Sequence, residues 1–139
     1  MISIIYVSSA TRLLPESELV ELLKTCRSKN EPLKITGMLL YQGGNFMQVI
    51  EGPEAAVTAL YEKIQRDPRH SGVYQLARKA IEKREFADWS MGFQNVDELP
   101  AEARAGFSEF LKDKFTAEVF RKEPGRAHRM LLMFRSNMR

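Results

Sequence analysis

Asn45-Phe46-Met47-Gln48-Val49-Ile50-Glu51-Gly52 has the composition of a β-strand, because apolar and β-branched residues dominate it. Successive side chains of a strand point to opposite faces of a sheet, so Phe46, Gln48 and Ile50 share one face. We expect the Gln48 carboxamide to be buried between these two apolar neighbours. Without a hydrogen-bond partner it would destabilise the fold by about 1–3 kcal/mol. A neighbouring side chain, a water or a ligand should therefore bind Gln48.

Four further strands and two helices are predicted around this segment. Residues 2–7 and 35–41 are rich in apolar and β-branched residues, and glycines in the 42–45 turn join the second stretch to the Gln48 strand as a hairpin. Later strands are predicted over residues 73–81 and 89–96. Helical spacing of apolar residues predicts helices over 15–28, from Leu19, Leu22, Leu23 and Cys26, and over 53–66, from Val57, Leu60, Tyr61 and Ile64.

The element order βαββαββ predicts an α+β fold. We expect a ferredoxin-like sandwich with a five-stranded mixed sheet and two helices on one of its faces. Helical patterns near residues 101–112, 116–121 and 128–135 should pack on the other face. The chain is accordingly divided into a domain over residues 1–96 and a C-terminal helical extension over residues 97–139.

The composition of the chain bears on its location and on the bonds that it can form. The chain has 139 residues, a net charge of +3 and one cysteine, Cys26, so no internal disulfide can form. The N-terminus lacks the basic start of a signal peptide, and no apolar run approaches the roughly 20 residues of a membrane span. These features predict a cytoplasmic protein. Charge is uneven, because residues 121–139 contain six basic residues and one acid.

Two polar residues near the predicted sheet need partners. In a ferredoxin-like sheet the first and third strands are neighbours, so Tyr6 and Gln48 could pair on one face. Alternatively, any nearby carbonyl could satisfy a core tyrosine. Asn30 follows the first helix, where it could cap the helix in a left-handed conformation or face a ligand. Lys29 beside it could neutralise an anion or be solvated.

A second polar cluster follows the second helix. Asp67, Arg69 and His70 could form an exposed turn, or they could offer a carboxylate and two donors to a ligand with hydroxyl and phosphate groups. Because this cluster and Lys29-Asn30 both follow helix C-termini, parallel helices would let a long polar ligand lie between them. Trp89 and Met91 fit a core interpretation. Zinc spacing, phosphate loops and catalytic triads are absent from the sequence.

Several segments together resemble the BLUF family of flavin-binding blue-light sensors. The resemblance covers residues 1–96, and its order and spacing are more specific than any one of its parts. Its parts are residues 4–9, Asn30, residues 35–41, 44–52, 64–70 and 84–91. It implies a ferredoxin-like domain that binds FAD without a covalent bond, with the isoalloxazine ring between the two helices.

The resemblance also implies roles for individual residues. Tyr6 would donate an electron and a proton to the excited flavin, and Gln48 would bridge Tyr6 and the flavin. Asn30 would hold the carbonyl and imide edge of the ring. The other implied roles are apolar walls from Leu39, Phe46 and Ile64, ribityl and phosphate contacts from Lys29, Asp67, Arg69 and His70, and signal relay through Trp89 and Met91. Lys29 departs from the His or Asn of some family members.

The expected function is a light-controlled switch that acts through contact with a downstream protein, without enzymatic turnover. No cyclase or phosphodiesterase sequence follows residue 96, which predicts a stand-alone sensor. A flavin-dependent enzyme is an alternative, as is a module that binds nucleic acid or an anionic membrane through basic residues 121–139. We expect no nucleic-acid or membrane partner. Apolar residues in the same tail predict a homo-oligomer.

Overall fold

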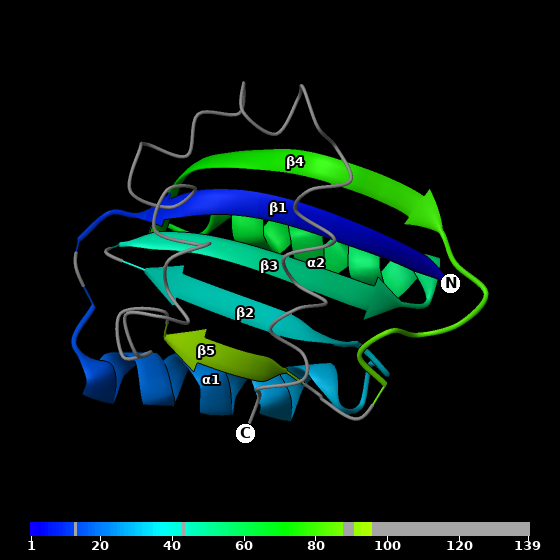
Figure 1. The fold of residues 1–139 in the computed structure, drawn as a ribbon, viewed down its shortest axis with the longest axis horizontal. Coiled ribbons are helices and arrows are strands. Elements are labelled where there is room, and N and C mark those ends of the chain that lie inside the picture. Colours follow the sequence, from blue (N-terminus) through cyan, green and yellow to red (C-terminus); the bar gives the residue numbers. More distant parts are fainter. Residues whose placement is uncertain (13, 43, 88–90, 96–139) are drawn as a thin grey trace, which may run out of the picture.

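A computed structural model describes residues 1–12, 14–42, 44–87 and 91–95 of the chain. Seven elements follow one another, and Figure 1 shows them as one sheet with two helices. The strands and helices are β1 (Ile2–Ala10), α1 (Glu16–Asn30), β2 (Thr36–Gln42), β3 (Asn45–Gly52), α2 (Glu54–Arg66), β4 (His70–Ala80) and β5 (Gly92–Asn95). The predicted α+β class and its two helices are confirmed.

The sheet has the strand order β4-β1-β3-β2-β5. The four long strands pair antiparallel, whereas the four-residue β5 joins β2 in parallel. The predicted adjacency of the first and third strands is confirmed, and Tyr6 lies directly opposite Gln48 in their register. Gly37 in β2 is required at its position, because a Cβ there would overlap the carbonyl oxygen of Val49.

Both helices pack on the sheet face that carries Tyr6 and Gln48. Figure 1 shows α2 behind β1 and β3, and α1 along the side of the sheet where β5 lies. The apolar stripe of each helix contains residues buried in the core and residues that are only partly buried. Leu19 and Leu23 of α1, like Val57 and Tyr61 of α2, are buried in the core with the even-numbered residues of β1 and β3. The remaining stripe residues, Leu22, Cys26, Leu60 and Ile64, are only partly buried.

Several predicted boundaries are corrected by the structure. Strand β4 begins at His70 rather than residue 73, because its pairing with β1 extends to Ala10. Helix α1 ends at Asn30 rather than residue 28, and a left-handed cap at Asn30 is wrong, because the positive φ (58°) belongs to Lys34. Strand β5 begins at Gly92. The predicted C-terminal helices and Trp89 lie outside the described residues.

A buried carboxylate fastens the connection between β4 and β5 to the end of β3. Glu51 is 1% exposed and accepts hydrogen bonds from Thr36 Oγ1 (2.9 Å) and from the backbone N–H groups of Glu85 (3.1 Å) and Phe86 (2.7 Å). The Arg84 guanidinium donates to the carbonyl oxygens of Lys34 (2.6 Å) and Glu51 (3.2 Å). These bonds fix the chain shortly before it reaches Met91.

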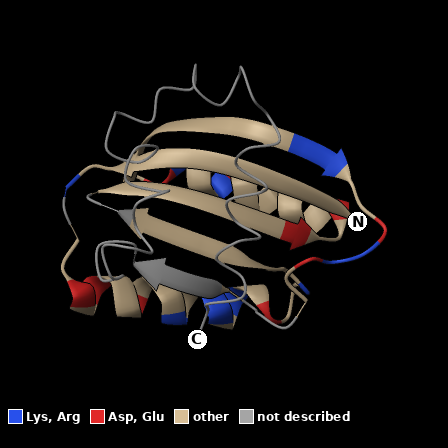
Figure 2. Ribbon diagram, viewed as in Figure 1, with Lys and Arg blue, Asp and Glu red and all other residues tan. Residues whose placement is uncertain are grey.

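Helix α1 has acidic residues at its start and basic residues at its end. Figure 2 shows acidic residues where α1 begins and basic residues near its end. These are Glu16 and Glu18 in the first turn and Arg27 and Lys29 in the last turn, an arrangement that favours the helix dipole. No helix in the described part of the chain is long and apolar enough to cross a membrane.

Candidate functional site

A cavity of about 270 Å³ opens between α1, α2 and the sheet. Its volume is close to the lower end of the roughly 300–1,000 Å³ typical of small-molecule sites. The predicted ligand residues from all parts of the chain converge on it. The lining includes Tyr6, Lys29, Asn30, Leu39, Phe46, Gln48, Ile64, Asp67, Arg69 and His70.

The cavity floor carries a buried hydrogen-bonded chain of three side chains. Tyr6 Oη donates to Gln48 Oε1, and Gln48 Nε2 donates to Met91 Sδ over 3.2 Å. The exposed fractions of Tyr6, Gln48 and Met91 are 1%, 5% and 1%. Since Tyr6 and Gln48 also face the cavity, a ligand there can compete for the remaining hydrogen-bonding positions of the Gln48 amide.

Tyr6 is held as a neutral phenol. Burial raises the pKa of Tyr6 well above its ordinary value, and the nearby Cys26, Tyr61 and Asp67 groups act in the same direction. Its ring also packs against Tyr61, with ring centroids 5.6 Å apart. A phenol in this setting keeps its proton at neutral pH and presents it to Gln48.

Asn30 brings a carboxamide to the cavity from the last residue of α1 and is 2% exposed. Its backbone carbonyl accepts hydrogen bonds from the N–H groups of Leu33 (3.1 Å) and Ile35 (3.0 Å). The turn after α1 therefore fixes the backbone that carries this side chain.

The cluster after α2 contributes an acid, a base and an imidazole to the lining. Asp67 accepts hydrogen bonds from the backbone N–H of Arg69 (2.9 Å) and from its guanidinium (2.6 Å to Oδ2). These side-chain bonds lower the pKa of Asp67 below its ordinary value. His70 Nδ1 lies 2.8 Å from Ser8 Oγ, and the His70 ring packs on Phe46 with centroids 5.1 Å apart. Burial lowers the pKa of His70.

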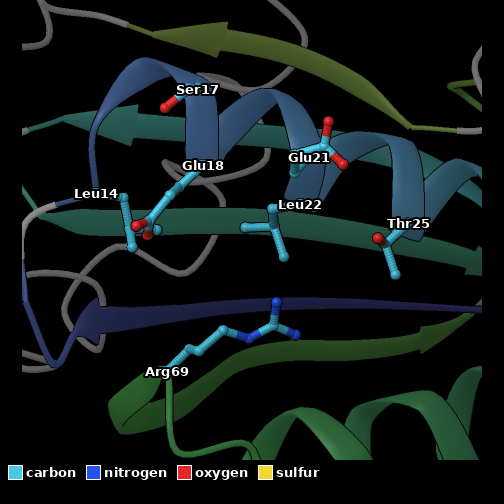
Figure 3. Close-up of a pocket in the computed structure, with 7 residues that line it drawn as sticks. All are labelled: Leu14, Ser17, Glu18, Glu21, Leu22, Thr25 and Arg69. Carbon is cyan, nitrogen blue, oxygen red and sulfur yellow. The ribbon is translucent and has the colours of Figure 1, made fainter.

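A second pocket of about 340 Å³ continues from the cavity along α1. Figure 3 shows the Arg69 guanidinium pointing from the β4 side toward Leu22 of this helix. Leu22, Thr25 and Arg69 line both spaces. The cavity and the second pocket thus form a groove along α1 that is longer than the cavity above Tyr6 and Gln48.

Sequence reasoning missed several cavity residues, although their spacing contains a usable signal. On α1 and on α2 they recur at spacings of three and four residues, so they extend the apolar stripe of each helix toward the cavity. Lys63 adds a cation that was not predicted. The missed residues are Leu22, Thr25, Cys26, Leu33, Ala56, Ala59, Leu60 and Lys63.

The donor set fits a flat heteroaromatic ligand with a polar edge. Leu39, Phe46 and Ile64 offer apolar walls, while the carboxamides of Asn30 and Gln48 can each donate and accept hydrogen bonds. An isoalloxazine ring, with carbonyl and imide groups along one edge, has this combination. The residues present therefore fit the flavin that the sequence resemblance implies.

Comparison with known proteins gives the same family. The family model for BLUF, "sensors of blue-light using FAD", matches residues 1–92. Photoactivated adenylate cyclase subunit beta of Euglena longa is 40% identical over 87 residues, which are 62% of this chain and 10% of that protein. The blue light- and temperature-regulated antirepressor BluF of Escherichia coli (strain K12) is 32% identical over 77 residues, covering 55% of this chain and 19% of that protein.

A solved structure extends the likeness beyond sequence. The dark-state structure of BlrB, a BLUF protein, has a TM-score of 0.73 and 32% identity, and the match covers 91% of this chain and 92% of that one. The chain belongs to the BLUF family, whose members bind flavin and sense blue light. It spans about a tenth of the first curated relatives that it matches.

Proposed function

We propose that this protein is a blue-light photoreceptor that binds FAD non-covalently in the cavity between α1 and α2. The observation that carries the proposal is the buried bond from Tyr6 to Gln48 on the cavity floor. The photochemical pair is thereby assigned to Tyr6 and Gln48. The second pocket supports FAD over a shorter flavin, because it adjoins the cavity and the Arg69 guanidinium, a group that suits phosphate, lines both spaces.

Each group of lining residues has a proposed task toward the cofactor. Asn30 and Gln48 hold the polar edge of the ring, and Leu39, Phe46 and Ile64 exclude water from its faces. Lys29, Asp67, Arg69 and His70 serve the ribityl chain and the phosphates. Guanidinium and ammonium groups suit phosphate, and a carboxylate suits hydroxyl groups.

Bound flavin supplies a strong oxidant when it absorbs blue light. Tyr6 is a suitable donor, because its neutral phenol can lose an electron while its proton passes toward Gln48 Oε1, the atom that already accepts its hydrogen bond. The Gln48 amide can then be satisfied in a second arrangement, in which its bond to Met91 Sδ is given up. Returning the electron and proton to Tyr6 restores the phenol, so only the hydrogen bonds around Gln48 differ.

The proposed output is a change in contact with another protein. Met91 immediately precedes β5, so a change at Gln48 reaches this strand through the sulfur contact. We further propose that residues 1–96 form the photosensor, that residues 97–139 relay its signal and support a homo-oligomer, and that the protein has no enzymatic turnover.

The central test is the absorption spectrum before and after blue light. The flavin-loaded protein should show a reversible red shift, because Gln48 strengthens its bonds to the flavin carbonyl. Gln48→Leu should retain flavin and lose the red shift. Gln75 is an exposed residue of β4 that pairs with Tyr6, so Gln75→Leu should retain both the flavin and the red shift. A full red-shifted photocycle in Gln48→Leu would refute the role of this residue.

A further inference from the structure

Arg27 of α1 reaches across to Met91, the residue that immediately precedes β5. Its Nε donates a hydrogen bond to the backbone carbonyl of Met91 over 2.9 Å, across 64 positions of sequence. Met91 is thus held twice, through its carbonyl by Arg27 and through its sulfur by Gln48. The next residue, Gly92, pairs with Met38 and begins β5. Figure 1 shows α1 beside β5, which lets one side chain span them.

The two bonds to Met91 differ in strength. A guanidinium donor gives a charge-assisted hydrogen bond, which is roughly twice as strong as a bond between neutral groups. A thioether sulfur is only a weak acceptor. The Gln48 contact alone therefore cannot determine where Met91 lies. Arg27 and the pairing of β5 must fix the backbone, and the sulfur is presented to Gln48 from that fixed position.

We infer that Arg27 is a positioning residue for Met91, which it holds as the acceptor for the Gln48 amide in the dark. The inference rests on the proposed photoreceptor function. Loss of Arg27 releases the Met91 carbonyl and weakens the dark arrangement of Gln48. Arg27 does not line the cavity, so flavin binding and the light-driven shift persist without it.

The test compares Arg27→Gln, Arg27→Lys and Lys24→Gln in the full-length, flavin-loaded protein. Lys24→Gln makes the same charge change on the same helix at an exposed residue whose ion pair is with Glu21. The Met91 methyl is followed by ¹³C NMR, with its signal assigned from Met91→Leu. We expect Arg27→Gln to move this signal in the dark and to slow dark recovery about threefold or more, since one charge-assisted bond is lost. Arg27→Lys should restore most of both.

Each other outcome has a defined meaning. An unchanged Met91 signal, or recovery that is unchanged or faster in Arg27→Gln, overturns the inference. So does loss of flavin in Arg27→Gln but not in Lys24→Gln, because Arg27 would then act on the cavity. If the parent protein shows no red shift, the photoreceptor proposal fails, while the dark NMR comparison still tests whether Arg27 places Met91.

Discussion

The oxygen and the nitrogen of the Gln48 amide make hydrogen bonds of unequal strength. Its oxygen accepts from a phenol, which is a good donor, whereas its nitrogen donates to a thioether, which is a poor acceptor. The cost of giving up the second bond is correspondingly small. A carboxamide buried in this way can change partners without leaving a strong donor or acceptor unpaired.

Tyr6→Phe should remove the light response and also destabilise the fold. The substitution deletes the donor to Gln48 Oε1 at a buried site, so we expect a loss of about 1–3 kcal/mol in the free energy of unfolding, measured with urea. Flavin should still bind. Tyr61→Phe is the matched control, since it keeps the ring contact with Tyr6 and leaves the Tyr6–Gln48 bond intact. Equal stability of Tyr6→Phe and the parent protein would contradict this.

The stability of the flavin-free protein should depend on pH through His70. Burial lowers the pKa of His70 below the ordinary value of 6.5, so between these two values the unfolded chain takes up a proton that the folded chain does not. The contribution of His70 to folding is therefore complete above about pH 6.5 and is lost as the pH falls toward the folded-state pKa.

His70→Gln isolates this effect. Urea unfolding from about pH 8 to about pH 5 should show a smaller loss of stability on acidification than in the parent protein. Carboxylates titrate in both proteins and cancel in the difference. Parallel stability curves would show that His70 is not held neutral by its burial.

At the scale of elements, each helix uses one apolar stripe for two surfaces. Leu19 and Leu23 anchor α1 to the sheet, while Leu22 and Cys26 of the same stripe line the cavity. The site is therefore bounded by the same periodic pattern that docks the helices, and its width depends on the small residues of α2.

Ala56→Leu should close part of this space. Ala56 lines the cavity and packs against the core, so a larger side chain would fill the ring site. We expect flavin affinity to fall about tenfold or more, because overpacking typically costs about 1–3 kcal/mol. Ala55→Leu, exposed one residue earlier in the same helix, is the control. Fluorescence titration with FAD measures the affinity of both variants. Equal affinities would show that the flavin ring does not bind beside Ala56.

The sequence predicted what depends on periodicity. Alternation in β3 and the adjacency of the first and third strands were enough to place Tyr6 beside Gln48. The start of β4 was not predictable, because His70-Ser71-Gly72 has no strand composition. His70 and Ser71 join the strand by pairing with β1, next to an irregularity in the pairing at which Gly72 has a positive φ of 59°. Arg27 was also missed, since its partner is a backbone carbonyl and carries no signature in the sequence. Lys63 was missed because a lysine that lines a cavity and a lysine exposed to solvent have the same appearance in a sequence.

At the scale of the whole molecule, the groove should distinguish flavins by length. If FAD occupied both the cavity and the second pocket, riboflavin, which lacks the phosphates and the adenosine, would fill only the cavity. A ligand that binds only the folded state stabilises it by about 2.7 kcal/mol at one hundred times its dissociation constant. We therefore expect FAD to raise the melting temperature more than riboflavin at equal concentration. Equal shifts in a thermal melt would show that the second pocket is not used.

The strands that carry the proposed photochemical pair determine which parts of the sheet can move quickly and which move slowly. Tyr6 and Gln48 lie on β1 and β3, and each of these strands is hydrogen-bonded to a neighbour on both sides. Separating them would require opening of the sheet, so we expect the movement that follows electron transfer from Tyr6 to be a rearrangement of side chains and not of the backbone. The short β5 lies at the edge of the sheet. For the proposed photoreceptor we therefore expect the stages on the microsecond scale and beyond at this edge, and the faster stages at the side chains in the centre of the sheet.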